Sequence, residues 1–200
     1  MNVSLQYSID FMGGIYYDNR LQFNSYSLSL QMLTASSDAL VTNISLERIK
    51  AFVMGELENV VFINRENEAQ AEMLQAIGAN VCTLPDEPVD QIIGIMLYCK
   101  LNAITEGQLL VTKLDISSSL GDEVWYQHNE EDHLGPFAAD GWWHKRSCQK
   151  DTLDPEGTAE NVVKVESTGW QEYGLEWPES KKEKAEANVV RPDFKKNEAK

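Results

Sequence analysis

The chain has 200 residues, a net charge of −15 and a mean hydropathy of −0.37, which suits one globular domain with an appendage. No apolar run reaches the roughly 20 residues that span a bilayer, and the N-terminus lacks the features of a signal peptide. We therefore expect a cytoplasmic protein without membrane contacts. The 32 acidic residues outnumber the 17 basic ones, so the surface repels phosphate backbones and direct nucleic-acid binding is not expected.

The composition changes along the chain. Residues 1–146 carry 20 acidic and 8 basic side chains, whereas residues 147–200 carry 12 and 9 and are poor in Leu, Ile and Phe. Such a segment buries too little apolar surface to offset its ordering entropy. We predict a folded domain over residues 1–148 and an acidic, largely disordered tail over residues 149–200.

Alternating apolar and polar residues open the domain. This period predicts strands over residues 5–11 and 25–33, paired antiparallel around a turn at residues 17–20. A helical period then begins at Leu46, with Asn43 or Ser45 as its N-cap. The next segments predict a strand–helix–strand crossover over residues 59–64, 66–78 and 79–85.

The most apolar helix of the chain follows, capped by Asp86 and running to Leu101. Residues 108–117 and 123–128 then pair as a hairpin. The element order predicts an α+β fold, in which an antiparallel sheet carries its helices on one face.

Four potential metal ligands occur close together, namely His128, His133, His144 and Cys148. Imidazole and thiolate are the ligands that zinc prefers, and their spacing is compatible with one tetrahedral site. The alternative is that these histidines are solvated loop residues. Zinc is the one cofactor that the sequence suggests.

Aromatic residues concentrate in two further segments. Trp142 and Trp143 form either a partner-binding platform or anchors that cover the edge of the sheet. Trp170, Tyr173 and Trp177 punctuate the acidic tail. They belong either to a segment that folds onto a protein partner or to a strap packed on its own domain.

Catalytic motifs are absent from the sequence. It contains no G-x-S-x-G elbow, no phosphate-binding P-loop and no H-E-x-x-H pair. Asp115, in the middle of a predicted strand, is solvent-facing or else needs a partner.

Three segments, LERIKAFVMGELENVVFIN, LPDEPVDQIIGIMLYCKL and LLVTKLDIS, resemble the tunnelling fold of the 6-pyruvoyl-tetrahydropterin synthases over about residues 5–128. The resemblance implies subunits that associate into a barrel, a zinc ion held by histidines of the first two strands, and a pterin-anchoring glutamate. Here Phe11 and residues 24–26 occupy the histidine region, and Asp115 is the nearest carboxylate. The resemblance therefore implies a degenerate member without the family's metal chemistry.

The segment TLPDEPVDQIIGIMLYCKLNAI, together with GPF and GWWH, also resembles accessory proteins of large contractile-tailed bacteriophages. We thus expect a phage-encoded, non-enzymatic interaction protein, homo-oligomeric or bound to a protein partner in the host cytoplasm through its acidic surface and aromatic tail. One alternative is a pterin- or deazapurine-type enzyme that has moved its metal to the His128–Cys148 cluster. Another is a DNA mimic that inhibits a host enzyme.

Overall fold

The computed structural model describes residues 3–122, 124–149 and 169–178. Disorder was predicted over residues 149–200, of which residues 150–168 and 179–200 lie outside the described residues. No helix within the described ranges is long and apolar enough to cross a membrane.

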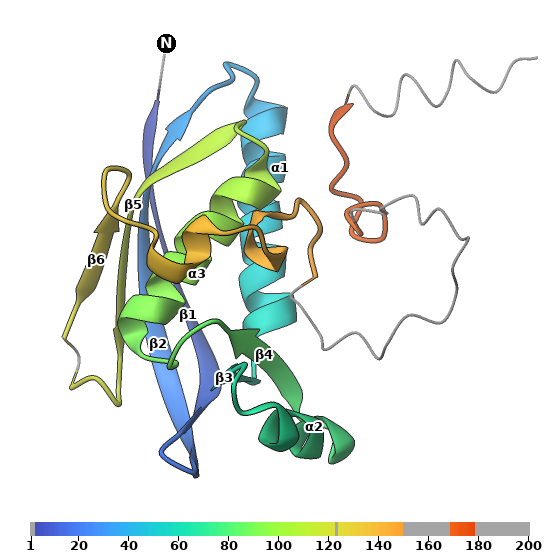
Figure 1. Cartoon of the computed structure of the whole chain (residues 1–200). Helices are drawn as coiled ribbons and strands as arrows, with labels where there is room; N and C mark the ends of the chain where they lie inside the picture. The colour runs from blue at the N-terminus through green and yellow to red at the C-terminus, as the bar shows by residue number, and fades with distance from the viewer. Residues whose placement is uncertain (1–2, 123, 150–168, 179–200) are drawn as a thin grey trace, which may run out of the picture.

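A single sheet and three α-helices make up most of the described chain (Figure 1). Their bounds are β1 Ser4–Tyr17, β2 Arg20–Thr34, α1 Ala39–Ala51, β3 Val60–Asn64, α2 Glu68–Ala76, β4 Asn80–Leu84, α3 Asp90–Thr105, β5 Leu109–Ser118 and β6 Tyr126–Asn129. A π-helical turn, Phe52–Leu57, continues α1, and two 3₁₀ turns occupy Gly135–Ala138 and Trp142–His144.

The long hairpin of β1 and β2 lies at the centre of the sheet, whose order is β4-β3-β1-β2-β5-β6. Its turn is made by Asp18 and Asn19, both with positive φ (49° and 57°), as a two-residue hairpin whose twist matches its strands requires. The predicted pairing of β1 with β2 is confirmed, as is the hairpin of β5 and β6.

The predicted crossover of β3, α2 and β4 is confirmed, and its two strands are parallel. β3 also pairs parallel with β1, over Gly13–Tyr16. Gly13 allows this close approach, because a Cβ there would lie 3.1 Å from the Val60 carbonyl oxygen. The sheet is therefore mixed, with antiparallel pairing among β1, β2, β5 and β6 and parallel pairing at its β3–β4 end.

The α+β class is confirmed, with α1 and α3 together on one face of the sheet (Figure 1). Val60 and Phe62 of β3 face this main core, whereas Val61 and Ile63 belong to a second apolar cluster with Leu74 of α2. Helix α2 thus covers the opposite face of β3 and β4, because strands buried on both faces need a helix on each side.

Two predicted helix caps are wrong. Helix α1 begins earlier, after Asp38, whose Oδ1 accepts the backbone N–H of Leu40 at 2.8 Å. Ser45 lies inside the helix and donates its hydroxyl to the Val41 carbonyl. Asp86 lies four residues before α3 begins and accepts the N–H of Glu87. Helix α1 thus begins before the predicted start at Leu46, whereas α3 begins after the turn that Asp86 was expected to cap.

Candidate interaction site

One edge of β1 is open over half its length. Strand β3 covers β1 only from Gly13 onward, because Asn59, with φ of 60°, turns the chain from the π-helical turn into β3. The N–H of Asn59 donates to the Met12 carbonyl at 2.8 Å, and the N–H of Met12 donates to Glu58 Oε2 at 3.1 Å. The hydrogen bonds that cover this edge of β1 therefore extend from the C-terminal end of the strand back to Met12 and no further within the described residues.

Alternate residues of an antiparallel strand direct their backbone N–H and C=O groups to opposite sides. The backbone N–H and C=O of Met12 point away from β2. The backbone groups of the even-numbered residues before Met12 therefore also point away from β2. These residues are Ser4, Gln6, Ser8 and Asp10. Within the described ranges these outward backbone groups have no hydrogen-bond partner.

This edge lacks the usual protection against pairing with another chain. Natural edge strands carry lysines, prolines or bulges that block a further strand. Residues 4–10 contain none of these, and their one charge is Asp10. Leu5, Tyr7 and Ile9 are half-buried against the core on the helix side. The segment is therefore a regular strand with an unsatisfied edge.

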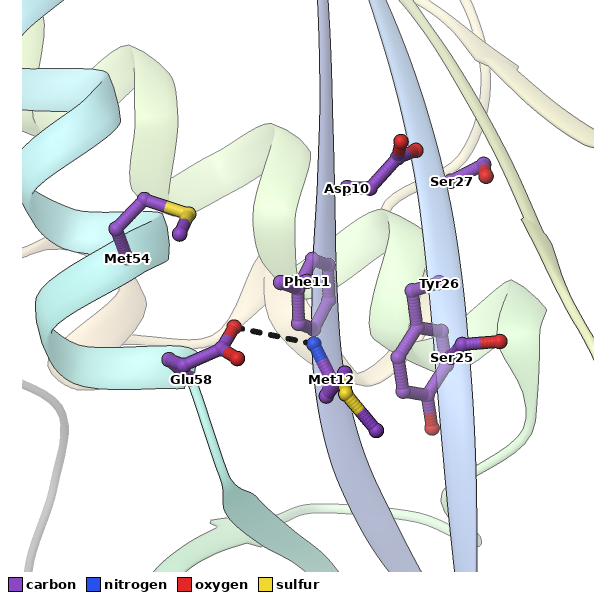
Figure 2. Close-up of a pocket in the computed structure, with 8 residues that line it drawn as sticks. All are labelled: Asp10, Phe11, Met12, Ser25, Tyr26, Ser27, Met54 and Glu58. Atoms are coloured by element: carbon purple, nitrogen blue, oxygen red, sulfur yellow. Dashed lines mark hydrogen bonds between the residues drawn. The ribbon is translucent and has the colours of Figure 1, made fainter.

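A hollow of about 320 Å³ lies where the open edge ends (Figure 2). Met54 and Glu58 of the helical side face Asp10 and Met12 of β1 across it. The remaining lining residues are Phe11, Ser25, Tyr26 and Ser27.

Phe11 and Tyr26 lie in the region where the tunnelling-fold resemblance implies zinc-binding histidines. Their rings stack with centroids 4.8 Å apart, and both side chains are buried. Burial raises the pKa of the Tyr26 phenol. At the positions where the resemblance implies histidines, these two aromatic side chains therefore pack against each other.

The sheet face opposite α1 and α3 is polar over its central strands. Ser8, Ser29, Asp115 and Gln127 form one row across β1, β2, β5 and β6. Asp115 accepts a hydrogen bond from Gln127 Nε2 at 2.8 Å and lies 3.2 Å from Lys113 Nζ. Asp115 is therefore a paired carboxylate of this face.

The four predicted metal ligands lie in different surroundings. His128 of β6 is buried against the Tyr98 ring, with centroids 4.6 Å apart, and burial lowers its pKa. His133 is exposed. His144 Nε2 lies 2.8 Å from the Phe137 carbonyl oxygen, and Cys148 is buried. In the described part of the chain, no three His, Cys, Asp or Glu residues group so as to hold a metal ion.

Trp142 and Trp143 pack on α3 and are 5% and 6% exposed. Trp143 Nε1 donates to the Phe137 carbonyl at 3.0 Å. Lys100 of α3, fully buried, donates to the carbonyls of Trp142 and Lys145. Burial lowers the pKa of Lys100 to about 8. The two tryptophans thus cover the helix layer, and the edge of β1 stays open.

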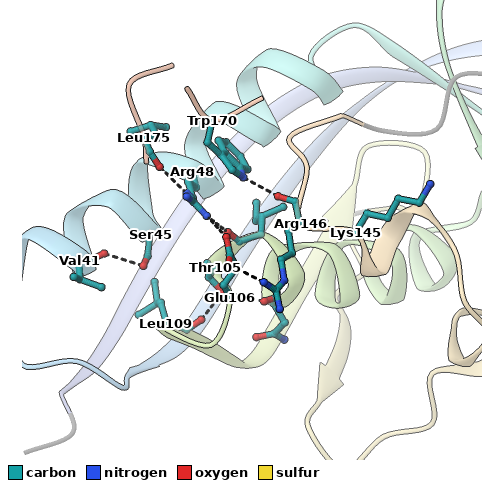
Figure 3. Close-up of polar contacts among 12 residues, drawn as sticks. Val41, Ser45, Arg48, Thr105, Glu106, Leu109, Lys145, Arg146, Trp170 and Leu175 are labelled. Atoms are coloured by element: carbon teal, nitrogen blue, oxygen red, sulfur yellow. Dashed lines mark hydrogen bonds and ion pairs between the residues drawn. The ribbon is translucent and has the colours of Figure 1, made fainter. Parts of the chain in front are cut away.

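Residues 169–178 lie against the domain (Figures 1 and 3). Of the two arrangements that the sequence allowed, this is the strap packed on its own domain. Trp170 is fully buried, and its Nε1 donates to the Arg146 carbonyl at 2.7 Å. Arg48 Nε donates to the Leu175 carbonyl at 2.9 Å. Tyr173 remains 47% exposed, so it is the aromatic residue of the strap most accessible to a partner.

Sequence reasoning missed Arg48, which holds this strap. Its Nη1 donates to Glu106 Oε1 at 2.8 Å and to the Ile104 carbonyl at 3.0 Å (Figure 3). Burial lowers the pKa of Arg48, while Glu106 acts in the opposite direction. The available signal was the position of Arg48 beside Ile49 on the apolar side of its helix.

No protein-family model and no curated protein matches the sequence. Among solved structures, the chain is similar to the crystal structure of an uncharacterized protein, WS1659 from Wolinella succinogenes. The sequences are 10% identical, the TM-score is 0.49, and the match covers 66% of this chain and 99% of the other.

Proposed function

We propose that this protein is a non-enzymatic assembly protein whose partner is a second copy, joined along the open edge of β1. The observation that supports the proposal is the run of unpaired backbone groups at Ser4, Gln6, Ser8 and Asp10. These residues are exposed, and a further strand satisfies their free backbone groups with regular hydrogen bonds.

The register follows from which groups are free. Two antiparallel copies of β1 use all four open residues only when the two-fold axis passes through Tyr7. Ser4 then pairs with the partner's Asp10, and Gln6 pairs with the partner's Ser8. A shift by two residues toward Met12 would place a strand on groups that already bond Glu58 and Asn59.

The side chains suit this self-pairing. On the helix side, Leu5 faces the partner's Ile9, and apolar cross-strand pairs of this kind stabilise a sheet by roughly 0.2–1 kcal/mol each. On the polar side, Asp10 faces the partner's Ser4, so the one charge of the segment meets no like charge. The same patch serves both subunits, as a two-fold interface requires.

The molar mass in solution tests the proposal directly. Size-exclusion chromatography with light scattering is expected to give a dimer for the full chain. Ser8→Pro removes an outward N–H while leaving the hydrogen bonds to β2, since proline is tolerated on edge strands, and is expected to give a monomer. Ser8→Thr keeps the N–H and should remain dimeric. A full chain that stays monomeric at high concentration contradicts the proposal.

Engineered cysteines test the register. Directly opposed residues that do not share hydrogen bonds have Cα atoms about 4.5 Å apart, a separation that a disulfide accepts. Tyr7→Cys is therefore expected to cross-link two chains on oxidation. Ile9→Cys, which faces the partner's Leu5, should not. Cross-linking by Ile9→Cys alone would indicate dimerisation in another register.

A further inference from the structure

A second hollow, of about 300 Å³, lies on the polar face between β2 and β5. It is lined by Ser25, Ser27, Ser117, Ser118, Ser119 and Trp125. It adjoins the hollow at the edge of β1, because Ser25 and Ser27 line both. It is distinct from the dimer edge, which runs along the other side of β1.

Two of the hydroxyl groups of this hollow are bonded within the protein. Ser118 donates to the Asp90 carboxylate, and Ser119 donates to Asn24 Oδ1. Ser117 is only 5% exposed, and its side chain lies on the polar face opposite Ser27. The Ser117 side chain lines the hollow, so its hydroxyl is open to a ligand there and can donate or accept a hydrogen bond.

Trp125 supplies an apolar wall. It is 54% exposed, although a tryptophan gains most by burial, and an exposed ring beside polar groups is typical of a binding surface. The other described tryptophans are less exposed, and Trp170, Trp142 and Trp143 are buried.

The charged residues around the hollow bear on the charge of the ligand that it can bind. None of its lining residues is Lys or Arg, and the adjoining hollow contributes Asp10 and Glu58. An anionic ligand such as a phosphate would lack a counter-charge and would be repelled by a chain of net charge −15. The charges therefore disfavour an anion, and the hydroxyl groups that line the hollow favour a ligand rich in hydroxyl groups.

We infer that this hollow binds one neutral sugar unit. Sugar hydroxyls both donate and accept hydrogen bonds, and serine hydroxyls can also donate and accept them. The C–H face of the ring packs on the Trp125 indole, and Ser117 bonds a hydroxyl at the base of the hollow. A volume of about 300 Å³ lies at the lower end of small-molecule sites, so it accommodates one ring with its neighbours outside.

Titration of the full chain with neutral sugars tests the inference. The probes are glucose, galactose, mannose and N-acetylglucosamine and the disaccharides of each, followed by calorimetry and by ligand-observed NMR. At least one probe is expected to bind with a dissociation constant of about 1 mM or below, near −4 kcal/mol. Tighter binding of a disaccharide identifies a glycan, and equal binding identifies a free sugar.

Variants locate the site. Trp125→Ala and Ser117→Ala are each expected to weaken that binding at least about tenfold. Phe23→Ala is the matched control, because Phe23 is an exposed aromatic residue of β2 (80%) that does not line the hollow. The affinity of this variant for the sugar should equal that of the wild type. Circular dichroism verifies that each variant folds. Binding that survives Trp125→Ala, or no binding of any probe, overturns the inference.

Discussion

The guanidinium carbon of Arg48 lies 3.9 Å from the centroid of the Trp177 ring. The same carbon lies 4.9 Å from the centroid of Trp170, so one cation of α1 meets two rings of a segment more than 120 residues away in the chain. Glu106 neutralises the guanidinium at 2.8 Å, from the C-terminal end of α3. These contacts join α1, α3 and the strap 169–178 into one cluster.

Arg48→Met is expected to lower the free energy of unfolding by about 2–4 kcal/mol, because it removes the hydrogen-bond donor of Glu106 Oε1 and of the Leu175 carbonyl. Arg48→Lys should recover little of this loss, since an ammonium cannot bond in two directions while lying flat on a ring. Urea unfolding measures both. Lys50→Met, on the exposed side of α1, is the control. Equal destabilisation by the two methionine variants would contradict the cluster.

Gly169→Ala is expected to detach the strap. Gly169 has φ of 73°, and an added Cβ would collide with the Cys148 sulfur. Gly174→Ala is the matched control, because Gly174 also has positive φ (67°) but open space around its Cα, so only the backbone cost of about 1 kcal/mol remains. Thiol labelling of Cys148, which is buried by the strap, should accelerate strongly in Gly169→Ala and little in Gly174→Ala.

Lys100 makes stability depend on pH. Burial lowers the pKa of Lys100 from its ordinary value of 10.5 to about 8 in the folded protein, so the unfolded chain binds more protons between these values. Stability from this group therefore rises as pH rises from about 8 to 10.5. Because burial also raises the pKa of Tyr98 and Cys99, these groups add their own dependence on pH, and the useful quantity is the difference between the wild type and Lys100→Met. The wild type should gain on the order of 1–3 kcal/mol over the variant between these limits. A constant difference would contradict a depressed lysine pKa.

The order of strands and helices could be predicted from the sequence because most elements have a clear apolar period. Residues 25–33 and 108–117 alternate, and the helix through Leu101 is apolar on several sides. The pairing of β3 with β1 could not be predicted, since five consecutive buried residues fit either neighbour and either direction. The extent of that pairing depends on the single positive φ of Asn59, and the open edge follows from it.

The candidate site was predicted less well than the fold. Candidate residues were chosen for their chemistry, as His, Cys and Trp, and most of them are buried in separate places. The two proposals instead rest on backbone groups of β1 and on the serine hydroxyls of a hollow, and neither kind is distinguished in a sequence. Arg48 was overlooked for a related reason, because its partners come from α3 and the strap.

Salt is expected to strengthen the proposed dimer. Each copy carries a net charge of −15, so the two copies repel, and ions screen that repulsion beyond about 10 Å at 0.1 M. The paired edge contributes only one charge per copy, Asp10, so screening removes little attraction. Sedimentation at about 0.05 M and 0.5 M salt should show a dissociation constant that falls severalfold. A dimer that dissociates as salt rises would require an interface held by opposite charges.

His128 is expected to make the protein sensitive to mild acid. The ring is fully buried, its Nε2 has no hydrogen-bond partner among the described residues, and burial lowers its pKa below the ordinary value of 6.5. As pH falls below about 6.5, the unfolded chain therefore takes up a proton that the folded protein resists, and stability is lost. His128→Phe should retain the packing on Tyr98 and abolish this loss, as measured by thermal unfolding between about pH 7 and pH 5. His133→Gln, at an exposed position, should keep the acid sensitivity of the wild type. If His128→Phe loses stability with acid as steeply as the wild type, the proton is taken up elsewhere.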